Sequence, residues 1–409
     1  MRGYELSELR TYYDNLIELL DRKGPTLAHD VMKIPVKEYT DPDLWQREVE
    51  MFRTTPAMLA FSGELPEPGS YLAITRAGVS VVLTRLKTGE VRMFINACRH
   101  RGAKVVPDGS GSGPRMTCPY HAWTFGLDGK LLAIAERENF GEVDKNCLGL
   151  IALPVEERAG LIWGILTPGV KLDLDEFLGP EMSEAIEKAD YGRYRLASRV
   201  EMPAANWKLT DEGFRESYHL GPLHPTTLSS FMYPSIMKFE KMGLHTRFYT
   251  PALGIRECDP SSIEDLRRNV QIAVTLFPST EISFASDTAF SSGPEGREPH
   301  TRIFSNQVWP GDAPDKSITI SRTLIDVEFV GTPLEEEIRN WSANSHNLVR
   351  TEDYPMVQTT QDNLRAPGQE YFVIGRNEIG VQHLHESLHE YFGNGPEGDA
   401  KQPALSAVG

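Results

Sequence analysis

The sequence predicts an α+β protein in which an all-β module is followed by a mixed domain built around an antiparallel sheet. Short β-forming runs separated by turn residues fill the chain from about residue 71 to residue 166. In the second half, consecutive strands precede long helices, unlike the alternating order of a parallel sheet. The strands are expected at 271–276, 281–287, 300–308 and 317–328, and the helices at 260–269, 333–349 and 352–365.

The chain is expected to divide into four segments. A helical segment, 1–56, packs on the second domain, because its opening stretch places apolar residues at helical spacing. The all-β module covers 57–168 and the mixed domain covers 169–395. Residues 396–409 are expected to form a loose tail. No Gly-x-Gly-x-x-Gly motif follows a strand, so a built-in nicotinamide or flavin domain is not expected.

Charge and cysteine content exclude several classes of protein. The formal net charge of -16 argues against nucleic acid or an anionic membrane surface as a partner. No apolar run reaches the roughly 18 residues that a membrane span needs, and the acidic start is unlike a secretory signal. Four cysteines are too few for a disulfide-stapled scaffold of this length. We therefore expect a cytoplasmic protein with reduced thiols.

One cysteine and one histidine occur together at two places in the all-β module. Cys98 and His100 form the first pair, and Cys118 and His121 form the second, each on a tight turn. A Rieske [2Fe–2S] centre needs this donor set, with two thiolates on one iron and two imidazoles on the other. The alternative is a Cys2His2 zinc site. Zinc fingers group both cysteines at one end, so the pattern here favours the Rieske centre.

The residues around these pairs resemble the Rieske domain of ring-hydroxylating oxygenase α-subunits. The resemblance rests on NACRHRG at 96–102 and CPYHAWTF at 118–125. Rieske proteins of respiratory complexes carry an additional cysteine in each turn, whereas Arg101 and Tyr120 stand near those places here. The oxygenase branch therefore fits better. The resemblance implies that a catalytic domain with a helix-grip (START/Bet v 1-like) fold follows the Rieske domain.

A second metal constellation is expected at His219 and His224. A helix predicted at 206–219 would end at Gly221 and Pro222, with His219 on its last turn and His224 on the exit loop. Both imidazoles can then turn towards one metal. A pair at this spacing is, taken alone, also typical of structural histidines.

A carboxylate from the late helix around residues 351–355 would complete the set. Two imidazoles and one carboxylate on one face of ferrous iron leave positions open for oxygen. The order of Rieske module, histidine pair and late acid is that of ring-hydroxylating oxygenases. The resemblance implies Asp353 as the third ligand, with Glu352 as the alternative.

The resemblance also implies a role for Glu216, which is expected one helical turn before His219. In the family, an acid here joins a mononuclear-iron histidine to a Rieske histidine of the neighbouring subunit. Glu216 would thus link His219 to His121 of the next chain; an ordinary solvated acid is the alternative. A glutamate occurs here in a branch that includes enzymes acting on quaternary amines. Gly213 departs from an asparagine often found beside the motif.

Together these features predict the terminal component of an oxygenase, a dioxygenase or monooxygenase. Electrons from NAD(P)H would arrive through a separate reductase, with or without a ferredoxin. They would pass from the [2Fe–2S] cluster to mononuclear Fe(II), where O2 hydroxylates an aromatic or related organic substrate. One alternative is oxidative N- or O-demethylation of a quaternary amine or ether; another is a Rieske electron carrier with a ligand-binding domain. The resemblance implies a homotrimer, with or without a small β-subunit.

Three further groups of residues each have two interpretations, one functional and one structural. A basic cluster near the Rieske turns can dock an acidic electron donor or offset the cluster's charge: Arg99, Arg101, Lys104 and Arg115. Several apolar residues can line a substrate cavity or form ordinary core: Phe231, Met232, Tyr233, Phe284 and Phe290. His383, His385 and His389 look metal-like, but without an acidic or thiolate partner in pattern a surface helix is expected.

Overall fold

The computed structural model describes residues 3–285 and 302–393 and divides the chain into two compact units. The small unit comprises Glu48–Phe177 and Tyr191–Arg195. The large unit comprises Met1–Arg47, Leu178–Asp190 and the chain from Leu196 onward. The predicted tail, 396–409, and Phe290 lie outside the described residues. Within the described ranges, no helix combines the length and apolar character needed to cross a bilayer.

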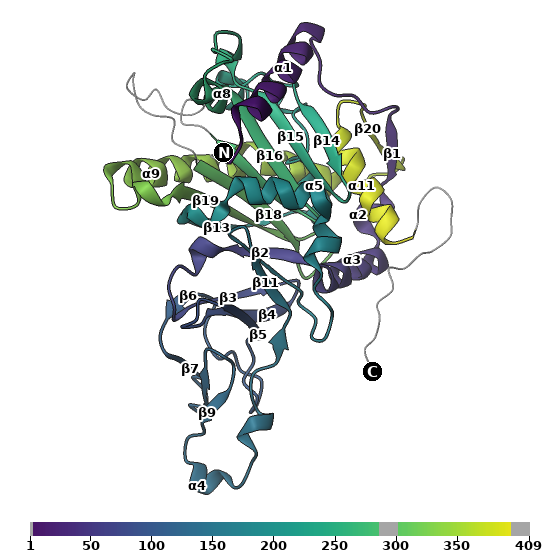
Figure 1. Ribbon diagram of the computed structural model, residues 1–409. Helices are drawn as coiled ribbons and strands as arrows, with labels where there is room; N and C mark the ends of the chain where they lie inside the picture. Colours follow the sequence, from purple (N-terminus) through teal and green to yellow (C-terminus); the bar gives the residue numbers. More distant parts are fainter. Residues whose placement is uncertain (1–2, 286–301, 394–409) are drawn as a thin grey trace. The chain divides into compact units, whose positions relative to one another are not determined.

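The small unit is built from short antiparallel strands, as predicted (Figure 1). The five-stranded sheet has the order β10 (Ala152–Leu153), β5 (Val91–Ile95), β4 (Val79–Arg85), β3 (Ser70–Arg76) and β6 (Gly109–Ser112). One three-stranded sheet has the order β11 (Val155–Arg158), β12 (Leu161–Gly164) and β2 (Ala57–Phe61). The other contains β7 (Arg115–Thr117), β8 (Thr124–Gly126) and β9 (Leu131–Ala133).

The β3–β4 hairpin shows how local sequence fixes this architecture. Ala77 and Gly78 form its two-residue loop, with φ angles of 45° and 77°. Two successive positive φ values give the turn whose twist matches that of paired strands. Arg53 supports the strained alanine, because its Nε donates a 2.8 Å hydrogen bond to the Ala77 carbonyl.

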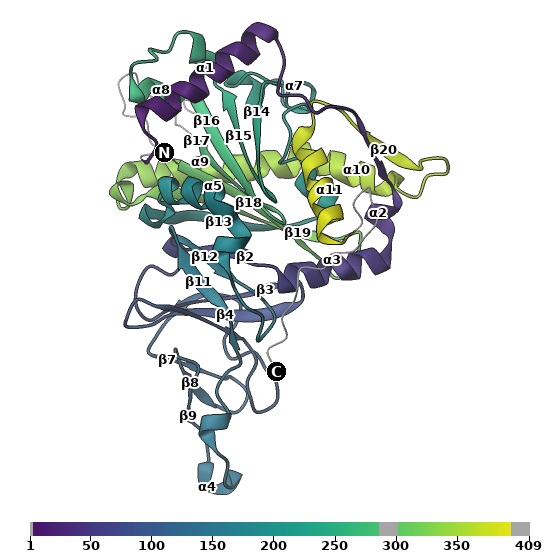
Figure 2. The ribbon, with the colours of Figure 1, turned by 45° about the vertical axis from the view of Figure 1, so that its right-hand side comes forward.

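The large unit is organised around a seven-stranded sheet (Figures 1 and 2). Its order is β13 (Tyr194–Ala204), β19 (Ser317–Asp326), β18 (Arg302–Pro310), β17 (Thr280–Ala285), β16 (Val270–Leu276), β15 (His245–Pro251) and β14 (Lys238–Met242). Adjacent strands from β19 to β14 pair antiparallel. A two-stranded sheet joins β1 (Met32–Pro35) to β20 (Tyr371–Ile374). The α+β class predicted from the strand order is confirmed.

Helices surround this sheet. Helix α1 contacts α8 and β15, while α9 contacts β19. Their bounds are α1 Leu6–Arg22, α2 Lys37–Thr40, α6 Trp207–Glu212, α7 Leu220–Leu223, α8 Ile263–Asn269, α9 Pro333–Leu348, α10 Tyr354–Asn363 and α11 Ile379–Tyr391. Helices α3 (Pro42–Thr54) and α5 (Leu174–Ala189) each contribute residues to both units.

The helix predicted at 206–219 is wrong beyond Glu212. An irregular segment follows, and short helix α7 then runs through Gly221 and Pro222, which were expected to end a helix. The cause is tertiary: Arg215 is buried and donates through Nη2 to the Pro278 carbonyl at 2.8 Å. This contact holds the chain against the end of the sheet, where a continued helix could not reach.

The two late helices predicted at 333–349 and 352–365 form one rod. A π-helical turn, Val349–Asp353, joins α9 to α10. Such turns accommodate an extra residue within a helix and occur often at functional sites. In Figure 2 the two helices follow one another along the sheet.

The buried pair of Arg215 and Asp211 generates a stability prediction. Both side chains are about 3% exposed, and Arg215 Nε donates to the Asp211 carboxylate. We expect Arg215→Ala to lower the free energy of unfolding by about 3–5 kcal/mol, because Asp211 would remain buried without its cation. Thermal denaturation measures the effect. Arg10→Ala, which breaks an exposed pair with Asp14, is the control and should change stability by about 0.5 kcal/mol or less. Equal melting temperatures for the two variants would contradict the prediction.

Candidate functional site

The two Cys–His turns of the small unit have the same backbone design. In each, the fourth residue after the cysteine donates back to the cysteine carbonyl: Gly102 to Cys98 at 2.8 Å and Ala122 to Cys118 at 3.0 Å. Both donors have positive φ angles, 77° and 52°. These left-handed residues turn the chain sharply, so that each cysteine and its histidine lie on the same tight loop.

The side chains of the two turns meet. Cys98 and Cys118 are buried, unbridged thiols, and burial raises the pKa of Cys98. The ring centroids of His100 and His121 are 4.6 Å apart, and Trp123 stacks on His100 at 5.1 Å. His100 Nδ1 is buried with no hydrogen-bond partner among the described residues. Two thiols and two imidazoles, one with an unsatisfied buried nitrogen, fit a Rieske [2Fe–2S] cluster.

In the large unit, a cavity of about 220 Å³ opens among the strands of the sheet, helix α9 and the segment from residue 213 to residue 232. Aromatic and aliphatic side chains form most of its lining, including Phe231, Met232, Phe248, Phe284 and Phe304. Three of these were among the expected cavity residues; Tyr233 does not line it. His219, Glu216 and Asp353 are among the polar residues of the same lining.

His219, His224 and Asp353 converge on one point. Asp353 Oδ1 lies 3.1 Å from His224 Nε2 and 3.5 Å from His219 Nε2. One donor atom from each of the three residues lies within 4.8 Å of the others. The His219 and His224 residues flank α7 at its two ends, and Asp353 is the last residue of the π-helical turn. This donor set matches the two-histidine, one-carboxylate arrangement of non-haem iron sites.

Glu352, the alternative third ligand, occupies a different position. Its Oε2 lies 2.7 Å from His224 Nδ1, the ring nitrogen that faces away from Asp353. The same oxygen accepts a 3.1 Å hydrogen bond from Thr227 Oγ1. A carboxylate on the second nitrogen of a ligating histidine fixes its tautomer and orientation. The geometry thus brings Asp353, and not Glu352, to both imidazoles.

Glu216 also lies elsewhere than predicted, because it belongs to the irregular segment between α6 and α7 and not to a helix. It nevertheless contacts His219: its carboxylate pairs with His219 Nδ1 and accepts a 3.1 Å hydrogen bond from the His219 amide. His219 therefore has Glu216 on one ring nitrogen and Asp353 on the other.

The electrostatics of this cluster favour a cation. Burial by itself lowers the pKa of His219, but the carboxylates of Asp353 and Glu216 outweigh it and raise the pKa to about 9. The pKa of His224 is raised in the same way, with burial opposed by Asp353 and Glu352. Burial raises the pKa of Asp353, yet the two imidazoles bring it below its ordinary value. An excess of carboxylates thus surrounds two imidazoles.

Fold and donor sets together define an iron-dependent oxygenase with a Rieske cluster, and comparisons with known proteins agree. The Rieske [2Fe-2S] domain family matches residues 55–145, and the catalytic domain of the ring hydroxylating alpha subunit family matches residues 191–394. The chain belongs to the ring-hydroxylating oxygenase α-subunit family. It is a terminal oxygenase component, an oxidoreductase with a Rieske cluster and mononuclear iron, and not an electron carrier alone.

Relatives with named activities differ in substrate. The carnitine monooxygenase oxygenase subunit of Escherichia coli strain K12 is 33% identical over 377 residues, covering 88% of this chain and 93% of that protein. The corresponding subunit of Acinetobacter pittii is 34% identical over 192 residues, 46% of this chain and 51% of its own length. The large oxygenase component of naphthalene 1,2-dioxygenase from Pseudomonas aeruginosa is 32% identical over 220 residues, 52% and 47% of the two chains.

Solved structures confirm the fold. A quaternary ammonium Rieske monooxygenase in complex with L-carnitine superposes with a TM-score of 0.69 at 22% identity, covering 88% of this chain and 96% of that chain. Naphthalene 1,2-dioxygenase from a Rhodococcus species, bound to indole, gives a TM-score of 0.70 at 19% identity, covering 93% and 97%.

Proposed function

We propose that His219, His224 and Asp353 hold the mononuclear iron at which this chain oxygenates its substrate. The observation that carries the proposal is the convergence of both Nε2 atoms on Asp353 Oδ1 at the wall of the cavity. Ferrous iron held by these three residues would leave positions open for O2 beside the substrate. The apolar lining excludes water from the reacting groups, and Glu352 and Glu216 orient the two imidazoles.

The cluster ligands in this proposal are Cys98, His100, Cys118 and His121: the two cysteines are buried, and the two partly exposed imidazole rings lie 4.6 Å apart. Glu216 would connect His219 to His121 of a neighbouring subunit. Its contact with His219 Nδ1 supports this role. One solved relative is described as showing inter-subunit electron transfer. A homotrimer, with or without a small β-subunit, would supply the neighbouring subunit.

Electrons would come from NAD(P)H through a separate reductase, with or without a ferredoxin. Three basic residues beside the Rieske turns, Arg99, Arg101 and Arg115, are exposed and can attract an acidic donor. Lys104 contributes less to this basic cluster, because its Nζ pairs with the Asp108 carboxylate at 2.7 Å.

The substrate we propose is a cationic amine with an apolar substituent. Glu281 lines the cavity and is 8% exposed. Burial raises the pKa of its carboxyl to about 8, although hydrogen bonds from Ser283 and Asn306 act to lower it. An organic cation beside it would stabilise the carboxylate. The neighbouring phenylalanine rings can contact the same cation through their faces.

The lining also limits this substrate class. Among the described residues that line the cavity there is no lysine or arginine. A substrate with its own carboxylate would bury that charge without a lysine or arginine partner, which is costly. We therefore propose an amine without a carboxylate, which differs from the carnitine and glycine betaine named for relatives.

A second candidate is a neutral aromatic substrate, as first expected from the sequence. The mainly aromatic and aliphatic lining favours it. The protonated carboxyl of Glu281 would then donate a hydrogen bond to a polar substituent. The two candidate substrates therefore require different charge states of Glu281: the cationic amine needs the carboxylate, and the neutral aromatic needs the protonated carboxyl.

The iron site can be tested by paired substitutions. Asp353→Asn should lose the mononuclear iron and keep the Rieske absorption, because it removes the carboxylate shared by both imidazoles. Glu352→Gln should retain iron with an affinity lowered by roughly 10–100-fold, since Glu352 contacts the outer nitrogen of His224 and not the nitrogen that faces Asp353. Iron counting and absorption spectra after purification measure both. Loss of iron from the Glu352 variant alone would reverse the assignment. His219→Ala should behave like Asp353→Asn.

The electron path can be tested at Glu216. Glu216→Gln should keep both metal centres but lower reductase-coupled turnover by at least roughly 10–100-fold, because the amide replaces one of the two acceptor oxygens with a donor. Reoxidation of the reduced Rieske cluster by O2, followed optically with substrate present, should slow to the same extent. Glu90→Gln, at an exposed residue of the small unit, is the control. Normal reoxidation in the Glu216 variant would refute the connecting role.

The substrate class can be tested with benzyltrimethylammonium and its neutral isostere neopentylbenzene. Cation binding needs ionised Glu281. The pKa of this carboxyl is about 8, so the group is mostly protonated at lower pH. Affinity for the cation should therefore rise about tenfold per pH unit between about pH 6 and 8 and then level off. Glu281→Gln should abolish this dependence and leave the neutral isostere unaffected. Calorimetric titration measures both; a pH-independent affinity in the unsubstituted protein would favour the neutral candidate.

A further inference from the structure

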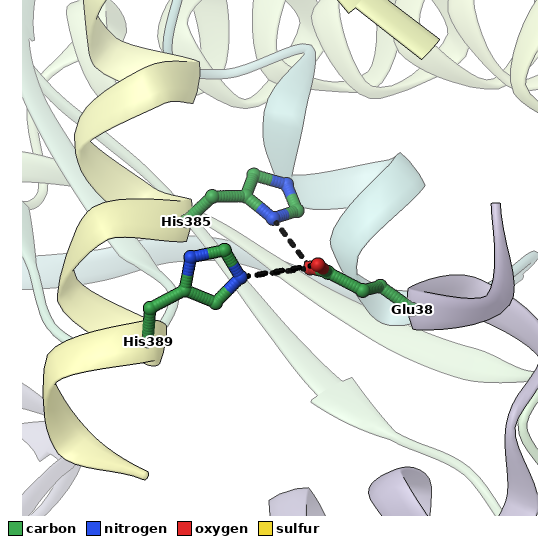
Figure 3. Close-up of side chains that lie close together, drawn as sticks. All are labelled: Glu38, His385 and His389. Atoms are coloured by element: carbon green, nitrogen blue, oxygen red, sulfur yellow. Dashed lines mark hydrogen bonds and ion pairs between the residues drawn. The ribbon is translucent and has the colours of Figure 1, made fainter. Parts of the chain in front are cut away.

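A second cluster of two histidines and a carboxylate lies outside the cavity (Figure 3). His385 and His389 are four residues apart on α11, so both rings project from one face of this helix. Glu38 reaches them from α2. The sequence predicted a surface helix here without an acidic partner. That prediction is wrong, because His385 is fully buried and its acidic partner comes from a segment almost 350 residues earlier.

The distances in this cluster are those between ligands of a single ion. His385 Nδ1 lies 3.3 Å from Glu38 Oε2, and His389 Nε2 lies 3.1 and 3.2 Å from the two Glu38 oxygens. One donor atom from each residue lies within 4.8 Å of the others. Two ligands of a tetrahedral zinc ion, each about 2.0–2.1 Å from the metal, are separated by roughly 3.3 Å.

The outer nitrogen of His385 has the partners that metal-binding histidines usually have. His385 Nε2 lies 3.0 Å from Glu212 Oε1, and Tyr39 donates a 2.8 Å hydrogen bond to the same oxygen. The Tyr39 proton is therefore committed to Glu212, which leaves the carboxylate free to accept from His385 Nε2. A histidine that donates through Nε2 presents the lone pair of Nδ1 to Glu38. Against burial, Glu212 and Glu38 raise the pKa of His385, so the contact between Nδ1 and Glu38 is satisfied either by a second ring proton or by a metal ion between the two atoms.

We infer that Glu38, His385 and His389 bind one divalent first-row transition-metal ion, for which zinc is the best match. Two imidazoles and one carboxylate are a common zinc donor set, and magnesium or calcium would prefer oxygen ligands throughout. Water can complete the coordination from the side of His389, whose side chain is 36% exposed. This site is distinct from the proposed iron site and does not depend on the proposed function.

The ion would tie together three parts of the large unit. Glu38 lies on α2, the histidines lie on α11, and Glu212 is the last residue of α6. Because Glu212 is followed directly by the segment that carries Glu216 and His219, the ion would hold the end of α6 from which that segment departs. We expect a positioning role, and hence an effect on stability, more than a direct part in chemistry.

Metal analysis of the purified holoenzyme tests the inference. The unsubstituted protein, dialysed against zinc and then against metal-free buffer, should hold about one zinc per chain besides its iron. His389→Gln and Glu38→Gln should each weaken zinc binding by at least roughly 10–100-fold. Their Rieske absorption should be unchanged, which shows that the protein is folded. His29→Gln, at a side chain that is 98% exposed, is the matched control and should retain zinc.

Zinc X-ray absorption of the unsubstituted protein adds a structural measurement. The spectrum should show nitrogen and oxygen neighbours at about 2.0–2.1 Å and no sulfur, which excludes zinc misplaced at the Rieske cysteines. Another first-row metal that His389→Gln removes would also support the site. Equal metal content in the unsubstituted protein and the His389 variant would overturn it, and would mean that protons on the two imidazoles balance Glu38 and Glu212. The proposed function is tested separately, by loss of iron from Asp353→Asn, a variant in which Glu38, His385 and His389 are unchanged.

Discussion

The candidate iron site depends on one constraint: two imidazoles five positions apart must present the same nitrogen to one carboxylate. A continuous helix through residues 206–224 would send the two rings to different sides. Buried Arg215 prevents such a helix, because its guanidinium donates to Asp211, Thr275 and Pro278 and fixes the chain to the sheet. The short α7 then sets the spacing, with His219 before it and His224 after it.

The opposite wall of the site also depends on an irregular stretch of backbone. Helices α9 and α10 would form one regular rod, but the π-helical turn between them adds a residue at Val349–Asp353. Two adjacent acids thereby reach different nitrogens of the site, Asp353 at Nε2 of both histidines and Glu352 at Nδ1 of His224. The histidines and carboxylates of the candidate iron site thus lie on irregular backbone, which the regular helices and strands around it hold in place.

Carboxylates on the outer nitrogens of histidines recur through the large unit. Glu216 faces His219, Glu352 faces His224, and Glu212 faces His385. Such partners fix the tautomer and make the inner nitrogen a better ligand. In a chain with a net charge of -16 the clusters are negative before any metal binds, so cations are attracted to them. Glu281, in the mainly apolar cavity, differs from these carboxylates, because no lysine or arginine lies beside it among the described residues of the lining.

The sequence by itself determined the order of the modules and the types of donor atom. Cysteine–histidine pairs on short turns and alternating β-type runs are local features, so spacing alone predicted a Rieske domain and an antiparallel sheet. Only the tertiary structure decided which carboxylate meets which imidazole. Asp353 and His224 are 129 positions apart, and Glu38 and His389 are 351 apart. Whether these distant residues meet depends on the path of the whole sheet and on a buried arginine, and neither can be predicted from a local sequence pattern.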